Sequence, residues 1–198
     1  MNSDHKKPAL ALILFFPLSF SAYCQVTLTL PTENKTNSQQ PNTLCMAGEK
    51  SIFTCFTGKK AASLCIKKGR NDLFVQYRYG TSKKLELAYP TTQRNSAGKF
   101  MLSTTPYPGG GANRIRFVNG GYNYFMYDIT KSKVDSDGQS YPIFMSGILV
   151  RKDGRNIASL YCDNEDAGIS SIAFDIFNEE NFDRNIDMSG AALPGHSP

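Results

Sequence analysis

Histidine is almost absent from this 198-residue chain, which carries only His5 and His196, one near each end of the sequence. Ser-His-Asp and Cys-His hydrolases need an imidazole that packing holds beside the nucleophile. Residues so close to a chain end are rarely held by packing. The sequence therefore predicts a protein without these hydrolase chemistries, and we expect neither a metal nor a cofactor in it.

The sequence also lacks an apolar run long enough to span a bilayer comfortably. Near the N-terminus, the charged residues 5–7 precede the twelve apolar residues 9–20, ALALILFFPLSF, and small residues follow. This pattern is typical of a cleaved export signal. We predict cleavage after Cys24 and a periplasmic or secreted protein that is not transmembrane. Lipidation of Cys24, for which Tyr23 is a poor preceding residue, and an uncleaved anchor are the alternatives.

Cysteine is scarce, with five in the chain, and the predicted cleavage removes Cys24. The remaining four, Cys45, Cys55, Cys65 and Cys162, form an even set in a protein bound for an oxidising compartment, where disulfides are expected. Nine residues separate neighbours among the first three, whereas zinc knuckles usually have two to four between ligands. We therefore expect two disulfides.

The pairing of these cysteines is predicted from a hairpin. SIFTCFT and AASLCIK resemble two strands joined by the turn GKK. Antiparallel pairing about that turn would place Cys55 nearly opposite Cys65, within reach of a disulfide. Cys45 is then left for Cys162. The other two connectivities of four cysteines stay open at this point.

Short runs rich in β-branched and aromatic residues recur about every ten residues, separated by turn signals such as NGG and KDGR. The predicted strands are SIFTCFT, AASLCIK, DLFVQYRY, KLELAY, KFMLST, NRIRFV, YNYFMYDI, PIFMSGILV, NIASLYC and SSIAFDIF. This spacing favours an all-β fold, an antiparallel sandwich or small barrel of about 8–10 short strands. We expect a signal peptide at 1–24, a polar linker at 25–44, the β domain at 45–177 and an acidic, partly disordered tail at 178–198.

Charge is distributed unevenly along the chain, whose formal net charge is +5. Lys and Arg outnumber Asp and Glu by 18 to 7 over residues 49–155, whereas eight acids accompany one Arg over residues 163–187. In NRIRFV, Arg114 and Arg116 alternate with apolar residues, so we expect the arginines to face solvent. An anionic cell-wall polymer or an acidic protein could bind such a face; a merely solvated surface with the tail folded back on it is the simpler alternative.

A glycine-rich segment, PYPGGGANR, precedes a predicted strand, so it lacks the helix N-terminus of a phosphate site. We interpret it as a flexible binding loop, and we predict partner-binding residues at Tyr107, Arg114, Arg116 and Tyr122, because Tyr and Arg are favoured in interface hot spots. Basic strands with aromatics could stack nucleobases. We expect no nucleic-acid partner, because an exported protein seldom meets one.

The string GEKSIFTCFTGKKAASLC, followed by QYRYG, LELAYP, RIRFVNGGYNYFMYDI and LYC, resembles uncharacterised small exported proteins of Gram-negative bacteria. The resemblance covers residues 45–162 and implies an exported, two-disulfide β domain without a known activity. The chain is more loosely similar to periplasmic lysozyme inhibitors, which are small, disulfide-stapled β proteins, although it shows no clear version of their inhibitory loop motif.

These observations predict a non-enzymatic periplasmic binding protein, an inhibitor or immunity-type protein with a protein partner in the envelope. Two alternatives stay open. One is an enzyme that cleaves envelope glycans with two carboxylates, for which Glu49 and Glu86 are the residues to test. The other is a structural envelope protein without a discrete ligand.

Overall fold

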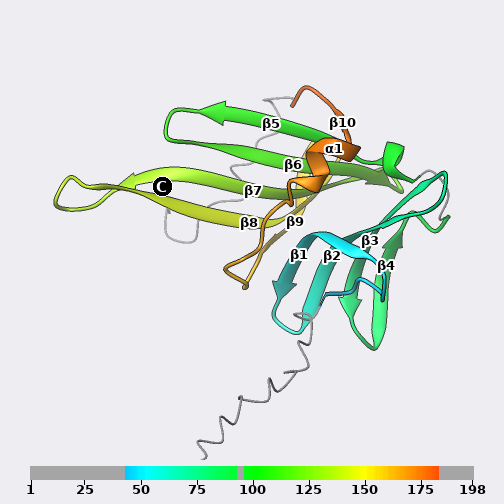
Figure 1. Ribbon diagram of the computed structural model, residues 1–198. Coiled ribbons are helices and arrows are strands. Elements are labelled where there is room, and N and C mark those ends of the chain that lie inside the picture. Colours follow the sequence, from blue (N-terminus) through cyan, green and yellow to red (C-terminus); the bar gives the residue numbers. More distant parts are fainter. Residues whose placement is uncertain (1–42, 93–95, 183–198) are drawn as a thin grey trace, which may run out of the picture. The chain divides into compact units, whose positions relative to one another are not determined.

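The computed structural model describes residues 43–92 and 96–182 (Figure 1). The predicted signal peptide, nearly all of the predicted linker and residues 183–198 of the predicted tail lie outside the described residues. Within the described part, no helix is long and apolar enough to cross a membrane.

The first sheet contains four antiparallel strands in the order β1-β2-β3-β4, each joined to the next by a hairpin or a short loop. The strands are β1 (Lys50–Thr57), β2 (Lys60–Lys68), β3 (Leu73–Thr81) and β4 (Lys84–Tyr89). Their short apolar runs and turn residues match the strands predicted from the sequence.

The second sheet contains six strands in the order β10-β5-β6-β7-β8-β9. They are β5 (Met101–Tyr107), β6 (Gly110–Asn119), β7 (Tyr122–Val134), β8 (Ser140–Lys152), β9 (Arg155–Tyr161) and the two-residue β10 (Asn178–Glu179). A 3-10 turn, η1 (Ala97–Lys99), precedes β5. All pairs are antiparallel except β10 with β5. The predicted all-β, largely antiparallel fold is confirmed.

The last predicted strand, SSIAFDIF, is wrong, because its centre forms the short helix α1 (Ile172–Ile176). Ala173 and Phe177 are both buried, and the amide of Phe177 donates to the carbonyl of Ala173. This four-residue spacing puts both side chains on one helical face. Periodicity alone does not separate a short apolar strand from a buried helical turn.

The two sheets share one core of aromatic and aliphatic side chains. Phe117 of β6 lies at its centre: its ring centroid is 4.9 Å from that of Tyr77 in β3 and 4.7 Å from that of Tyr124 in β7. Tyr89, at the end of β4, stacks on Phe117 with centroids 4.8 Å apart. Phe117 therefore joins strands of both sheets.

The predicted disulfide pairing is wrong. The bonds are Cys45–Cys65 and Cys55–Cys162, instead of Cys55–Cys65 and Cys45–Cys162. The β1–β2 turn is shorter than expected, so Cys55 pairs with Ala62, and Cys65 pairs with Ser51 beyond a bulge. Because side chains alternate between faces, Cys55 points into the shared core, whereas Cys65 lies on the other face of the sheet.

Candidate functional site

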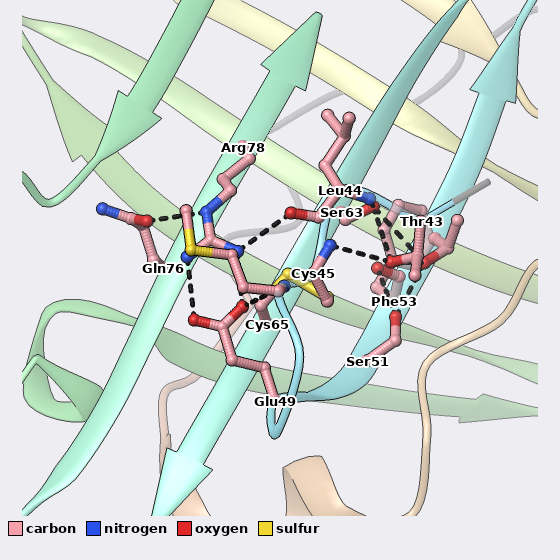
Figure 2. The surroundings of a disulfide bond; sticks show 12 residues. Thr43, Leu44, Cys45, Glu49, Ser51, Phe53, Ser63, Cys65, Gln76 and Arg78 are labelled. Carbon is pink, nitrogen blue, oxygen red and sulfur yellow. Dashed lines mark hydrogen bonds and ion pairs between the residues drawn. A yellow bond between two sulfur atoms is a disulfide. The ribbon is translucent and has the colours of Figure 1, made fainter. Parts of the chain in front are cut away.

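The outer face of the first sheet is covered by residues 43–49, which enter β1 (Figure 2). Three groups hold this segment on the sheet: the Cys45–Cys65 disulfide, a hydrogen bond from the amide of Leu44 to Ser63, and the side chain of Arg78. The segment therefore lies over polar residues of β2 and β3 that would otherwise face solvent.

Arg78 lies at the centre of this covered face, with 2% of its side chain exposed. Its Nη1 donates to the carbonyl of Leu44 at 2.9 Å, and its two terminal nitrogens donate to the carboxylate of Glu49 at 2.5 and 2.9 Å. Its Nε donates to the side-chain oxygen of Gln76. The guanidinium is thus bidentate to a carboxylate and bonded on its third side, as a buried arginine requires.

Glu49 is ionised at neutral pH in this environment. Burial raises the pKa of its carboxyl group, but hydrogen bonds from Arg78 and from the amide of Met46, together with the positive charge of Arg78, lower it more, so the net pKa lies below the ordinary value. A general acid for glycan cleavage needs the opposite shift. Glu86, the other carboxylate to test, pairs with Lys60 at 2.8 Å on the surface. The geometry therefore gives the carboxylate-enzyme alternative no support.

The sulfurs of Cys45 and Cys65 and a carboxylate oxygen of Glu49 lie within 4.8 Å of one another, as three metal ligands would. The sulfurs are bonded to each other, however, and a metal ligand is a thiolate. Glu49 is also bonded to Arg78. With the disulfide formed, the cluster therefore holds residues 43–49 on the sheet through one covalent bond and one ion pair.

The predicted binding loop does not exist as a loop. Residues 108 and 109 form a tight turn between β5 and β6, and Tyr107 pairs with Gly110 across it. The hydroxyl of Tyr107 lies 2.9 Å from the carbonyl oxygens of both Gly111 and Thr130, which share its single proton. Gly110 is required because a Cβ there would lie 1.9 Å from the carbonyl oxygen of Thr130. Gly110 therefore serves close backbone packing between β6 and β7.

The predicted basic face is not open to solvent. Arg114 is buried, and its guanidinium carbon lies 3.8 Å from the ring centroid of Phe182. Arg116 is hydrogen-bonded to both carboxylate oxygens of Glu180, which raises the pKa of the arginine despite its partial burial. The sequence showed that these arginines oppose the core, but it did not show that residues 180 and 182 cover them.

Tyr122 does not join the other three predicted residues. It lies at the β6–β7 hairpin, where it pairs with Asn119, and the ammonium of Lys152 lies 4.7 Å from its ring centroid. Its position in β7 places it on the same face as Tyr124, toward the first sheet, whereas Arg114 and Arg116 lie on the opposite face. The structure therefore gathers Tyr107, Arg114 and Arg116 on one face but not Tyr122.

The exposed feature that the sequence analysis missed is the end of the β7–β8 hairpin, residues 131–145, here called the arm. β6 pairs with β7 only as far as Thr130, and β9 pairs with β8 only as far as Gly147. The arm therefore extends beyond the neighbouring strands (Figure 1), and within the described residues its strands pair only with each other. The one feature that could have indicated the arm is strand length, because β7, YNYFMYDITKSKV, continues well past the end of the predicted strand YNYFMYDI.

The arm exposes large apolar side chains on both faces: Val134 is 60% exposed, Tyr141 40% and Phe144 72%. Tyr141 pairs with Lys133, so an aromatic ring and an ammonium lie side by side on one face. At the tip, a carboxylate oxygen of Asp135 accepts hydrogen bonds from the amides of residues 137 and 139, as in an Asx turn. The tip is thus internally hydrogen-bonded, while these apolar side chains belong to neither core cluster of the described residues.

No family model, no curated protein and no solved structure matches the chain. The functional proposal therefore depends on the geometry of the described residues. The resemblance to exported Gram-negative proteins stays a prediction. The two disulfides are consistent with an extracellular or periplasmic protein.

Beside β1, a groove of about 430 Å³ separates the strand from residues 164–170. Several polar groups that line this groove form hydrogen bonds within the protein. The amide of Ser170 donates to the carbonyl of Ile52, and Asn164 bonds to the backbone of Thr54 and Phe56. These bonds cover the exposed edge of β1, which is how proteins commonly protect an edge strand from further pairing. We assign the groove this protective role.

Proposed function

We propose that this chain is a non-enzymatic binding protein of the bacterial cell envelope that contacts a protein partner with its arm. The observation that supports this most directly is the exposure of Phe144, Tyr141 and Val134 on a hairpin that lies beyond the packed body. Several large exposed apolar side chains on one projecting element favour an interaction site. The arm extends from a sheet whose fold is held by two disulfides, so the base of the arm is already ordered. This order lowers the entropic cost of binding.

The chemistry of the arm indicates the kind of surface it fits. On one face of the arm, Lys131 pairs with Ile143 and Lys133 pairs with Tyr141. A hot spot of this composition fits an apolar cleft with an acidic rim. The unpaired strand edges of the arm can also add to a partner's sheet. The acidic, carboxylate-bearing cleft of a glycan hydrolase has such a rim, so we propose an inhibitor or immunity-type protein that inserts the arm into an envelope hydrolase.

The test compares two single substitutions in the oxidised mature protein. Phe144→Ser removes the most exposed ring of the arm, whereas Phe174→Ser removes a 45% exposed ring from α1, away from the arm. Purified protein is added to envelope hydrolases acting on isolated peptidoglycan, and release of soluble glycan is measured. We expect the wild type and Phe174→Ser to inhibit alike, and Phe144→Ser to inhibit at least about tenfold less, as for a hot-spot residue.

Two outcomes would contradict the proposal. One is no inhibition of any envelope hydrolase by the wild-type protein. The other is equal inhibition by wild type and Phe144→Ser, which would mean that the protein inhibits the hydrolase without using the arm. Release of glycan by the purified protein alone would instead favour the carboxylate enzyme. Glu86→Gln, and Glu49→Gln once circular dichroism shows that this variant is folded, would then identify the acid.

A further inference from the structure

The segment that covers the first sheet, residues 43–49, lies over polar side chains. Ser63, Gln76 and Arg78 belong to the covered face, and each is no more than 9% exposed. None of residues 43–49 belongs to either core cluster of the described residues. Lifting the segment would therefore expose groups that water can solvate, instead of a part of the apolar core.

The two disulfides are anchored differently in the backbone. Cys55 lies within β1, and Cys162 follows β9 and donates its amide to the backbone of β8. The amide of Cys45 instead donates to the hydroxyl of Thr43 in its own segment. Cys45 is also partly exposed, whereas its partner Cys65 is fully buried. A thiolate can therefore approach Cys45 from solvent without displacing a strand.

Arg78 is oriented by contacts within the sheet (Figure 2). Its Nε donates to Oε1 of Gln76 at 2.7 Å, and the side-chain amide of Gln76 donates to the carbonyl of Pro90 at 2.9 Å. Both partners lie outside the covering segment. The terminal nitrogens of Arg78, in contrast, are bonded to the carbonyl of Leu44 and the carboxylate of Glu49. Departure of the segment would therefore leave an oriented guanidinium whose carboxylate position is open.

The segment presents a carboxylate and a stretch of peptide backbone to this face. The amide of Leu44 donates to Oγ of Ser63 at 3.0 Å, and its carbonyl accepts from Arg78 at 2.9 Å. Glu49 supplies the carboxylate. The planar guanidinium matches a carboxylate bidentately, which an uncharged amide cannot reproduce. The covered face therefore has the groups that bind an acidic peptide, and residues 43–49 are the intramolecular example.

The disulfide decides whether the segment stays in place. When the segment lifts, Glu49 and Arg78 both regain hydration, so separating this ion pair costs much less than deleting one partner. The seven residues 43–49 also gain conformational entropy when they are released. The Cys45–Cys65 bond opposes this release, and its loss favours the open state.

We propose that the Cys45–Cys65 disulfide is a reducible clasp, and that opening it uncovers a binding site for an acidic peptide centred on Arg78. The reductant is a dithiol. Its thiolate attacks Sγ of Cys45, the S–S bond breaks, and Cys65 leaves as a thiolate that takes up a proton. The second thiol of the reductant then releases Cys45 as a thiol and forms the reductant's own disulfide. Two electrons and two protons thus pass from the dithiol to the two cysteines.

Limited reduction of the oxidised full chain tests the clasp. The protein is incubated with dithiothreitol, samples are alkylated with iodoacetamide under native conditions, and each cysteine is quantified by peptide mass analysis. We expect Cys45 and Cys65 to be alkylated at least about tenfold faster than Cys55 and Cys162, as locally accessible groups are. Cys65 is fully buried in the closed state, so its alkylation also reports detachment of the segment.

Equal rates for the two disulfides would overturn the clasp, since reduction would then require unfolding of the whole domain. A Cys65 that stays unmodified after Cys45 is alkylated would also overturn the proposal, because the segment would remain in place without its covalent bond.

Peptide binding tests the uncovered site. The probe is a fluorescent synthetic peptide of residues 43–49 that carries Cys45→Ser. Anisotropy should give a Kd at least about tenfold lower for protein opened by dithiothreitol than for oxidised protein, and a control peptide that also carries Glu49→Gln should bind at least about tenfold more weakly. The tethered segment competes equally with both peptides. Lys60→Ala, which removes an exposed cation of β2, should bind the probe like the wild type.

Equal binding of the two peptides, or equal binding by oxidised and opened protein, would overturn the site. Loss of binding in Lys60→Ala would also contradict it, because surface charge would then hold the peptide. None of these measurements involves the arm, so their failure leaves the proposed function untouched.

Discussion

Among single residues, Arg78 is under the strongest electrostatic constraint in the described structure. Its side chain and that of Glu49 are 2% and 5% exposed, and the two are bidentately paired. Removing one partner of such a pair leaves a charge in a poorly solvated site, which costs more than the net contribution of the intact pair. Surface pairs such as Lys60–Glu86 do not have this property, because water solvates each charge when the other is removed.

We therefore predict that Glu49→Gln lowers the free energy of unfolding by about 3–5 kcal/mol, the range for breaking a buried ion pair. Glu86→Gln is the matched control and should change it by less than about 1 kcal/mol. Urea unfolding at pH 7 under non-reducing conditions measures both. Equal effects of the two substitutions would mean that the Glu49–Arg78 pair does not stabilise the fold.

The lowered pKa of Glu49 also has a consequence for pH dependence. Because the folded-state pKa lies below the unfolded value, the stabilisation is present above the unfolded pKa and is lost as pH falls through the folded pKa. We expect the wild type to lose more stability than Glu49→Gln as the pH falls below about 4.5, the ordinary value for Glu. Parallel curves of unfolding free energy against pH for the two proteins would contradict this.

At the scale of elements, the β1–β2 hairpin determines which cysteines can meet. Cys55 and Cys65 lie on opposite faces of the same sheet, so each bonds to a different part of the chain: Cys65 to the segment before β1, and Cys55 to Cys162 after β9. The two disulfides thus connect different parts of the structure. One holds residues 43–49 over Arg78, and the other ties the first sheet to the end of the second.

The disulfides should differ in their contribution to stability. They close loops with sequence separations of 20 and 107 residues, and the chain-entropy model gives about 3 and 4.7 kcal/mol for loops of roughly those sizes. Replacing Cys55 and Cys162 by Ser should therefore destabilise the protein more than replacing Cys45 and Cys65. Thermal or urea unfolding of the two double variants measures this. Mass analysis of non-reduced peptides that finds Cys55 bonded to Cys65 would contradict the pairing itself.

For the whole molecule, the shared core predicts that the two sheets unfold together. Phe117 contacts aromatic rings from both sheets, and Cys55–Cys162 adds a covalent link between them. Sheets that share a core in this way have little stability apart, because each exposes its apolar face when the other leaves.

Phe117→Ala tests this coupling. Removing a fully buried Phe should cost about 3–5 kcal/mol, and unfolding should stay a single transition when tyrosine fluorescence and far-UV circular dichroism are compared. Phe174→Ala, which truncates an exposed ring, should have little effect. Separate transitions for the two probes would show that the sheets are independent units.

Much of the fold followed from local patterns. Alternation in NRIRFV correctly separated Ile115 and Phe117 from Arg114 and Arg116. The Asp-Gly pair of KDGR marked the β8–β9 turn, where both residues of the pair have positive φ. The candidate site was less predictable. Composition alone groups Tyr122 with Arg114. The exposure of Phe144 depends on where β6 and β9 end, which no pattern inside β8 indicates.

The sequence by itself determined the strand pattern, the two-disulfide chemistry and the polarity of each strand face, because these depend on neighbours along the chain. The tertiary structure alone decided which cysteines pair, which arginines are buried and which hairpin is left exposed. The pairing of Cys45 with Cys65 depends on the one-residue register of a turn, and the burial of Arg78 and Arg114 depends on Glu49 and Phe182, residues that lie far away in the chain. Contacts between residues far apart in the chain are set by packing in three dimensions, and local sequence periodicity does not predict them.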